Sequence, residues 1–138
     1  MIFISNFHID FHLTENNIDF IVLAGFMCIL SEKFNTLRTE GNLNNEIGVP
    51  KTLFCLEDYH EAAVIEMGMN HFGELHVLSN IANPTIAVIT NIGTAHIGNL
   101  GSRENILKAK LEILDGVNND MLVINNDNDM LHDYYLNN

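Results

Sequence analysis

Three short apolar runs in this sequence each end in a cluster of polar side chains. The runs occupy residues 62–65, 86–89 and 121–124. The polar residues that follow them are, in chain order, Glu66; Thr90, Asn91 and His96; and Asn125, Asn126 and Asp127. Runs of this kind are typical of buried parallel strands, whose carboxyl ends share the edge of an open α/β sheet where ligands bind. The sequence therefore predicts a site for a metal ion and a phosphate-bearing ligand.

Glu66 and His96 carry the side chains that a divalent cation could use. An ionised carboxylate directly after a buried strand needs a metal or a partner, so a structural ion pair is the competing interpretation of Glu66. For His96 the competing interpretation is a hydrogen-bonded loop histidine. Together, a carboxylate and an imidazole can hold a cation and leave positions for water and phosphate oxygens. We therefore predict that both residues face one crevice.

Lys110 lies on the apolar face of a helix predicted over residues 102–114, for which Ser102 is a suitable N-cap. At about 100° per residue, Lys108 and Glu112 point outward from this helix. The apolar face comprises Ile106, Leu107, Leu111, Ile113 and Leu114. Either the Lys110 stem packs on the core and its ammonium reaches the surface, or the crevice holds this lysine for a phosphate, a carboxylate or a chemical modification.

The elements that must position these residues alternate along the chain. A helix beginning at Glu74 and ended by Asn83 and Pro84 separates the first two runs, and the helix that contains Lys110 separates the last two. This order predicts an α/β fold with an open, mostly parallel sheet and flanking helices. We expect loops at residues 40–50, leading into a short helix, and at residues 93–101. Earlier segments predict a possible strand at residues 1–4 and an apolar strand or helix at residues 20–30.

Composition favours a single acidic domain. The 138 residues carry a formal charge of -12, which disfavours nucleic acid and anionic membrane surfaces as partners. The apolar stretch at residues 18–30 is shorter than the roughly 20 residues of a membrane helix. Cys28 and Cys55 fit small buried hydrophobes of a reducing compartment, and no lysine or arginine precedes Lys33, so we expect a cytoplasmic protein. The oligomeric state stays open.

Four segments, in order, resemble the central ATP-binding domain of the Mur ligases. They read Glu-Gly-Asn-Leu-Asn-Asn-Glu-Ile-Gly-Val-Pro (40–50), Val-Ile-Glu-Met-Gly-Met-Asn-His-Phe-Gly-Glu (64–74), Ile-Thr-Asn-Ile-Gly-Thr-Ala-His (89–96) and Ala-Lys-Leu-Glu-Ile (109–113). The resemblance implies a P-loop-NTPase-like fold for residues 31–138, as part of that domain. It leaves residues 1–30 unassigned.

The resemblance also implies an activity. Mur ligases of this kind use ATP and Mg²⁺ to convert a carboxylate of a UDP-N-acetylmuramoyl peptide into an acyl phosphate. The amine of D-alanyl-D-alanine then displaces phosphate, which forms an amide bond during peptidoglycan synthesis. This implies ATP and Mg²⁺ as cofactors, and the muramoyl peptide and the dipeptide as partners of the intact enzyme.

Individual positions match the residues that act in the family. Glu66 and His96 match magnesium-binding residues, and Lys110 matches a lysine that is carbamylated and thereby becomes an anionic magnesium ligand. Asn44 and Asn45 match residues near the reacting substrate and phosphates, and Asn91 is expected to bind the cofactor beside them. Asn125 and Asp127 match an Asn-x-Asp-Asp turn near the nucleoside, whose last Asp is Asn128 here.

The sequence also departs from the family. The glycine-rich phosphate loop with Lys and Thr, of the form Gly-x-x-Gly-Lys-Thr, does not occur in these 138 residues. The flanking domains that hold the UDP-sugar and the amine substrate are not recognisable either. We therefore expect a truncated or rearranged ligase fragment that is inactive alone. The alternatives are a non-catalytic module that binds magnesium nucleotide or a partner, and one half of a split enzyme.

Overall fold

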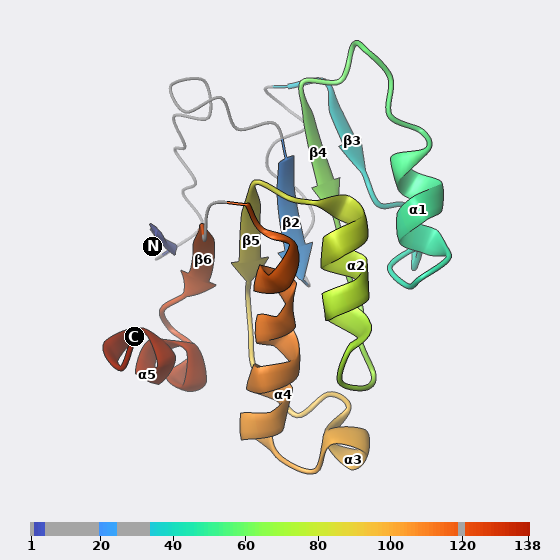
Figure 1. Cartoon of the computed structure of the whole chain (residues 1–138). Coiled ribbons are helices and arrows are strands. Elements are labelled where there is room, and N and C mark those ends of the chain that lie inside the picture. The colour runs from blue at the N-terminus through green and yellow to red at the C-terminus, as the bar shows by residue number, and fades with distance from the viewer. Residues whose placement is uncertain (1, 5–19, 25–33, 119–120) are drawn as a thin grey trace.

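A six-stranded sheet with every strand pairing parallel forms the centre of the molecule, in the order β1-β6-β5-β2-β4-β3. The computed structural model describes residues 2–4, 20–24, 34–118 and 121–138. The described strands are β1 (Ile2–Ile4), β2 (Phe20–Ala24), β3 (Thr36–Arg38), β4 (Ala62–Ile65), β5 (Ile86–Ile89) and β6 (Leu122–Asn125). Their arrows run in one direction, so their carboxyl ends share one edge (Figure 1).

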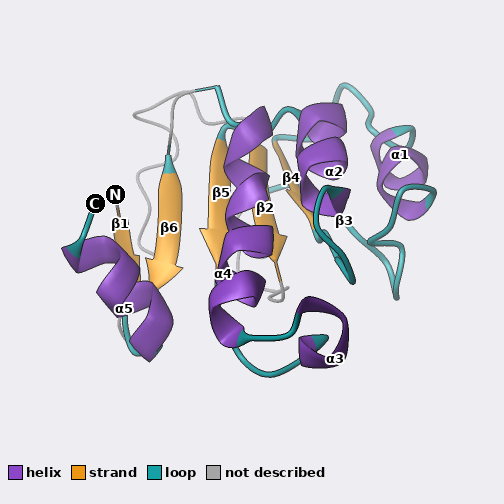
Figure 2. Cartoon of the chain, turned by 60° about the horizontal axis from the view of Figure 1, so that its bottom comes forward, coloured by secondary structure: helices purple, strands orange, loops and turns teal. Residues whose placement is uncertain are grey.

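Helices connect the strands and cover one face of the sheet, where α1, α2 and α4 lie side by side (Figure 1). Near the ends of the sheet, α3 lies below the carboxyl edge and α5 lies beside β6 and β1 (Figure 2). The helices are α1 (Gly48–Leu53), α2 (Glu74–Ala82), α3 (Ile97–Leu100), α4 (Arg103–Leu111), the 3₁₀ helix η3 (Glu112–Gly116) and α5 (Asp129–Leu136). None of the helices within the described residues is long and apolar enough to cross a membrane.

The core lies between the sheet and these helices. All four residues of β4 and all four of β5 are buried, as expected of strands in the interior of a parallel sheet. The helices contribute Leu75 and Leu78 from α2, and Ile106 from α4. Burial of such side chains stabilises a fold by roughly 1.5–3 kcal/mol each relative to exposure, so this layer fixes the positions of the loops that follow β4 and β5.

The sequence predicted much of this fold correctly. The parallel α/β sheet and the end of α2 at Asn83 are confirmed. The predicted short helix exists as α1, but it begins at Gly48, inside the loop predicted for residues 40–50. Ser102 caps α4, because its Oγ accepts a hydrogen bond from the Asn105 N–H at 3.2 Å. The possible strand at residues 1–4 is β1, and Phe20–Ala24 is a strand rather than a helix.

Other expectations were wrong or fall outside the described residues. The loop predicted at residues 93–101 contains the short helix α3, and Cys55 is exposed rather than buried. The helix predicted through residue 114 ends at Leu111, where the backbone tightens into η3. Cys28 and the boundary between residues 30 and 31 lie outside the described part of the chain.

Candidate active site

The loops after β4 and β5 meet α4 around a cavity of about 230 Å³. Glu66 directly follows β4, Asn91 and His96 lie on the loop after β5, and Lys110 comes from the last turn of α4. Asn44, from the loop before α1, completes the polar lining. The structure thus brings together three predicted metal residues and two predicted cofactor residues that span 67 positions of the sequence, from 44 to 110 counted inclusively.

Lys110 is half-buried and lines this cavity, in agreement with its place on the apolar face of the helix. Its Nζ donates a hydrogen bond to the backbone carbonyl of Asn91 at 2.7 Å. Burial lowers the pKa of the Lys110 ammonium below its ordinary value, because removal from water penalises the charged form. A lysine with a lowered pKa has more of its amine in the neutral, nucleophilic state at a given pH.

Glu66 is held in place from two sides. Its Oε1 accepts a hydrogen bond from the Asn44 side-chain amide at 2.9 Å, and its backbone N–H donates to Thr39 Oγ1, also at 2.9 Å. Asn44 is itself fixed, because its backbone carbonyl accepts a hydrogen bond from the Gly68 N–H at 2.8 Å. A Cβ at Gly68 would stand 3.0 Å from the Asn44 side chain, so the small residue permits this close approach. Among the described residues, no cationic group pairs with Glu66, so the interpretation of Glu66 as a structural ion pair finds no support.

His96 is exposed at the mouth of the cavity. Its backbone has a φ of 64°, in the left-handed region that non-glycine residues seldom occupy. The conformation starts α3, because the His96 carbonyl accepts the N–H groups of Asn99 and Leu100 at 3.0 and 3.1 Å. No hydrogen bond of the imidazole occurs within the described part of the chain, so its nitrogens are available to a ligand.

Three predicted cofactor residues do not line the small cavity. The side-chain oxygen of Asn45 accepts from the N–H of Gly48, the first residue of α1, at 2.9 Å. Asn125 Oδ1 accepts from the backbone N–H of Asp127 at 3.0 Å, which forms the turn after β6. Asp127 is exposed on that turn. The turn is nevertheless joined to the site, because Asn128 Nδ2 donates to Asn91 Oδ1 at 2.8 Å.

Two carboxylates that the sequence reasoning missed hold the loop after β4. Both carboxylate oxygens of Glu112, which was predicted to point outward from the helix, accept from the Gly73 N–H on the loop after β4, at 2.9 and 2.8 Å. A 3₁₀ turn has about 3.0 residues per turn, and the change from α4 to η3 at Glu112 alters where this side chain points. Glu74 accepts the N–H groups of Asn70 and His71. Burial acts to raise the pKa of Glu74, but these hydrogen bonds together hold it below its usual value.

The chemistry of the cavity suits a hard cation that keeps much of its own solvent. No group of three or more His, Cys, Asp or Glu side chains within the described ranges could enclose a metal ion by itself. Mg²⁺ is usually held by one or two carboxylates, with waters and phosphate oxygens in the other positions. The Glu66 carboxylate, the nearby amides and an exposed imidazole fit that mode of binding.

The comparisons with known proteins decide the family. The Mur ligase middle domain family matches residues 22–137 of this chain. The chain belongs to the Mur ligases. The resemblance drawn from four short motifs is therefore confirmed over residues 22–137, and so is the parallel α/β architecture.

Individual Mur ligases give the same result. The UDP-N-acetylmuramoyl-tripeptide--D-alanyl-D-alanine ligase of Bacillus subtilis (strain 168) is 48% identical over 96 residues, which cover 70% of this chain and 21% of the relative. The MurF ligase from Thermotoga maritima, solved in complex with ADP, superposes with a TM-score of 0.73 at 27% identity, over 88% of this chain and 32% of that one.

The name of a third similar Mur ligase specifies the peptide on which that enzyme acts. The structure of UDP-N-acetylmuramoylalanyl-D-glutamyl-2,6-diaminopimelate--D-alanyl-D-alanyl ligase from Acinetobacter baumannii has a TM-score of 0.71 and 37% identity, over 87% of this chain and 29% of that one. The present chain thus spans about a fifth of the length of the curated relative from B. subtilis.

Proposed function

We propose that this chain forms the catalytic centre of an ATP-dependent, amide-bond-forming ligase of peptidoglycan synthesis. The substrates would be a UDP-N-acetylmuramoyl peptide and D-alanyl-D-alanine. The proposal rests on the observation that Glu66, His96 and Lys110 line the same cavity, in a chain of the Mur ligase family. The names of the similar ligases supply the substrates, and the neighbour solved with ADP supports a nucleotide cofactor.

Mg²⁺ and ATP, when bound, would supply the phosphoryl group and the positive charge needed to convert the substrate carboxylate into an acyl phosphate. We assign magnesium binding to Glu66 and His96, with Asn44 keeping the Glu66 carboxylate oriented through their 2.9 Å hydrogen bond. A fixed carboxylate is a better ligand than a mobile one, because less side-chain freedom is lost when the cation binds.

Lys110 is proposed to act as a carbamate. The Lys110 ammonium first loses a proton to give the neutral Nζ. Addition of CO₂ then forms an N–C bond at the expense of one C=O π bond, and loss of a second proton from the nitrogen leaves an anionic carbamate. The carbamate nitrogen keeps one N–H, which can retain the hydrogen bond now made to the Asn91 carbonyl. The new carboxylate then adds a third metal-binding group beside the Glu66 carboxylate and the His96 imidazole, in a cavity whose described residues provide too few ligands on their own.

The remaining assignments concern the nucleotide. Asn91 borders the cavity, and Asn45 lies on the adjoining groove. We place Asn125 and Asp127 at the nucleoside side, because the hydrogen bond from Asn128 to Asn91 ties their turn to the loop after β5. We also propose that residues 1–138 alone do not complete the reaction, since the Gly-x-x-Gly-Lys-Thr motif does not occur in them.

Paramagnetic broadening in NMR spectra of the ¹⁵N-labelled chain tests the site. Mn²⁺ replaces Mg²⁺ at carboxylate and phosphate ligands and broadens nearby signals even when binding is weak. Titration with Mn²⁺ and ADP should first broaden the amides of Glu66, Asn91 and Lys110. Glu66→Ala should weaken this effect by about tenfold or more, the usual cost of losing a metal-site group. Glu57→Ala, an exposed carboxylate outside the cavity, serves as the matched control.

Broadening that spreads evenly over the acidic surface, or that survives in Glu66→Ala, would contradict the proposed centre. A separate assay measures phosphate release by the chain with ATP, Mg²⁺, muramoyl tripeptide and D-alanyl-D-alanine. We expect none. Sustained turnover would overturn the proposal that these residues are inactive alone.

A further inference from the structure

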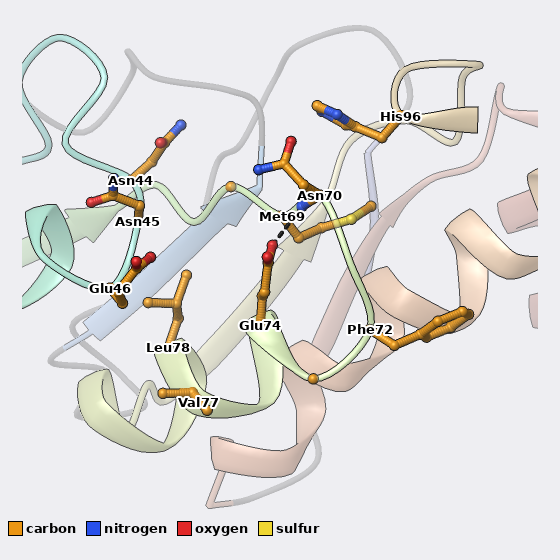
Figure 3. A pocket seen from close by; sticks show the side chains of 12 residues that line it. Asn44, Asn45, Glu46, Met69, Asn70, Phe72, Glu74, Val77, Leu78 and His96 are labelled. Atoms are coloured by element: carbon orange, nitrogen blue, oxygen red, sulfur yellow. Dashed lines mark hydrogen bonds between the residues drawn. The ribbon is translucent and has the colours of Figure 1, made fainter. Parts of the chain in front are cut away.

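A second, larger hollow adjoins the candidate active site. It is a groove of about 770 Å³ that shares Asn44, Gly68, Met69 and His96 with the small cavity. One wall comes from the loop before α1, and the other comes from the loop after β4 and the first turns of α2 (Figure 3). A substrate whose reacting carboxylate lies in the small cavity can therefore extend directly into this groove.

The groove has an apolar floor. Met69 and Leu78 are buried beneath it, whereas Phe72 and Val77 expose about half of their surface, at 50% and 48%. Val77 and Leu78 lie on the α2 side, and Met69 lies between them and His96 (Figure 3). Such a surface fits the methylene groups of an extended aliphatic chain, because contact with it removes apolar area from water.

The charged side chains that line the groove are acidic. Its lining contains two carboxylates, Glu46 and Glu74, and neither lysine nor arginine. Glu74 already accepts hydrogen bonds from the N–H groups of Asn70 and His71. Glu46 is exposed and has no hydrogen bond or ion pair within the described residues, and it lines the groove together with Leu78 (Figure 3). An ammonium group at the end of an aliphatic stem would pair with Glu46.

We propose that this groove binds the side chain of the peptide residue whose carboxylate is activated, and that Glu46 recognises the ammonium at the end of that side chain. The inference rests on the proposed function, in which the reacting carboxylate lies beside Glu66, His96 and Lys110. The peptide in the name of the A. baumannii neighbour ends in 2,6-diaminopimelate, whose side chain is a methylene stem with an ammonium and a carboxylate. Lysine shares the stem and the ammonium.

Binding of three tripeptides to the ¹⁵N-labelled chain tests the role of Glu46. The probes are L-alanyl-D-glutamyl peptides that end in 2,6-diaminopimelate, in L-lysine and in L-norleucine, which has the stem without the ammonium. The first two should shift the amide signals of Glu46 and Leu78 and bind about fivefold more tightly than the third, as a partly exposed ion pair allows. The difference in affinity between the diaminopimelate peptide and the lysine peptide measures the contribution of the side-chain carboxylate that only diaminopimelate carries.

Glu46→Gln should reduce the affinity for the two ammonium-bearing peptides to that for the norleucine peptide. Glu57→Gln should leave the preference for the ammonium-bearing peptides unchanged. Equal binding of all three peptides to the native chain, or a preference that survives in Glu46→Gln, would overturn the inference. The titration with Mn²⁺ and ADP tests the metal site at Glu66 and Lys110 independently of the groove. A failure there contradicts the proposed function, whereas the tripeptide comparison alone decides the role of Glu46.

Discussion

Lys110 and Glu112 stand two residues apart, and each binds the backbone of a different loop at the candidate site. Lys110 Nζ donates to the carbonyl of Asn91 at 2.7 Å, after β5, and the Glu112 carboxylate accepts from the N–H of Gly73 at 2.9 and 2.8 Å, after β4. The last turn of α4 and the start of η3 thereby join the two loops that carry Glu66 and His96. The geometry of the centre depends on this short segment.

Lys110 should form a carbamate more readily than the exposed Lys108. Burial lowers the pKa of Lys110, so its neutral amine becomes available to CO₂ at a lower pH than the amine of an ordinary lysine. The ¹³C NMR signal of a carbamate, formed in ¹³C-bicarbonate at rising pH, measures the reaction. Lys110→Arg should remove the first signal to appear, and Lys108→Arg should leave it. Simultaneous modification of both lysines would contradict the assignment.

Replacement of Glu112 by alanine should loosen the loop after β4. The substitution leaves the Gly73 N–H without its acceptor, and hydrogen bonds to charged groups typically contribute about 1.5–3 kcal/mol. Since this pair is partly exposed, we expect a loss near 1 kcal/mol in the free energy of unfolding. Exchange of the Gly73 amide with D₂O should be several-fold faster, as followed by NMR. Asp133→Asn, on the exposed face of α5, is the control, and unchanged exchange at Gly73 would refute the role of Glu112.

The ion pair between Arg103 and Asp129 should make stability depend on acid pH. Hydrogen bonds from the Arg103 guanidinium, at 2.8 and 2.5 Å, lower the pKa of Asp129 from 3.8 to about 2. Between pH 3.8 and about 2, the Asp129 carboxyl of the folded chain therefore binds fewer protons than that of the unfolded chain. The stabilisation is present above pH 3.8 and is lost as the pH falls toward 2.

Urea unfolding at pH 5 and at pH 2.5 measures this effect. Asp129→Asn should be less stable than the native chain at pH 5 and should differ less from it at pH 2.5. A constant difference between the two proteins at both pH values would show that Asp129 does not titrate in this way. Asp133→Asn again provides the exposed control on the same helix.

Sequence by itself determined the features that depend on near neighbours along the chain. The apolar runs of β4, β5 and β6 and the polar residues after them follow from residue type and order. The cap at Ser102 and the inward position of Lys110 follow from helical periodicity, which joins residues three and four apart. These local patterns were enough to place Glu66, Asn91 and His96 at one edge of a parallel sheet.

Only the tertiary structure decided how distant segments meet. β2 lies between β4 and β5, an order that no local pattern specifies, and Asn44 reaches Glu66 across 22 positions. Glu112 meets Gly73 across 39 positions, and the groove beside Glu46 exists because the loop before α1 faces α2. Local sequence sets backbone preferences within a few residues, whereas these contacts depend on the packing of α1, α2 and α4 onto one face of the sheet. That packing minimises exposed apolar area over the whole domain, and so it cannot be read from any one segment.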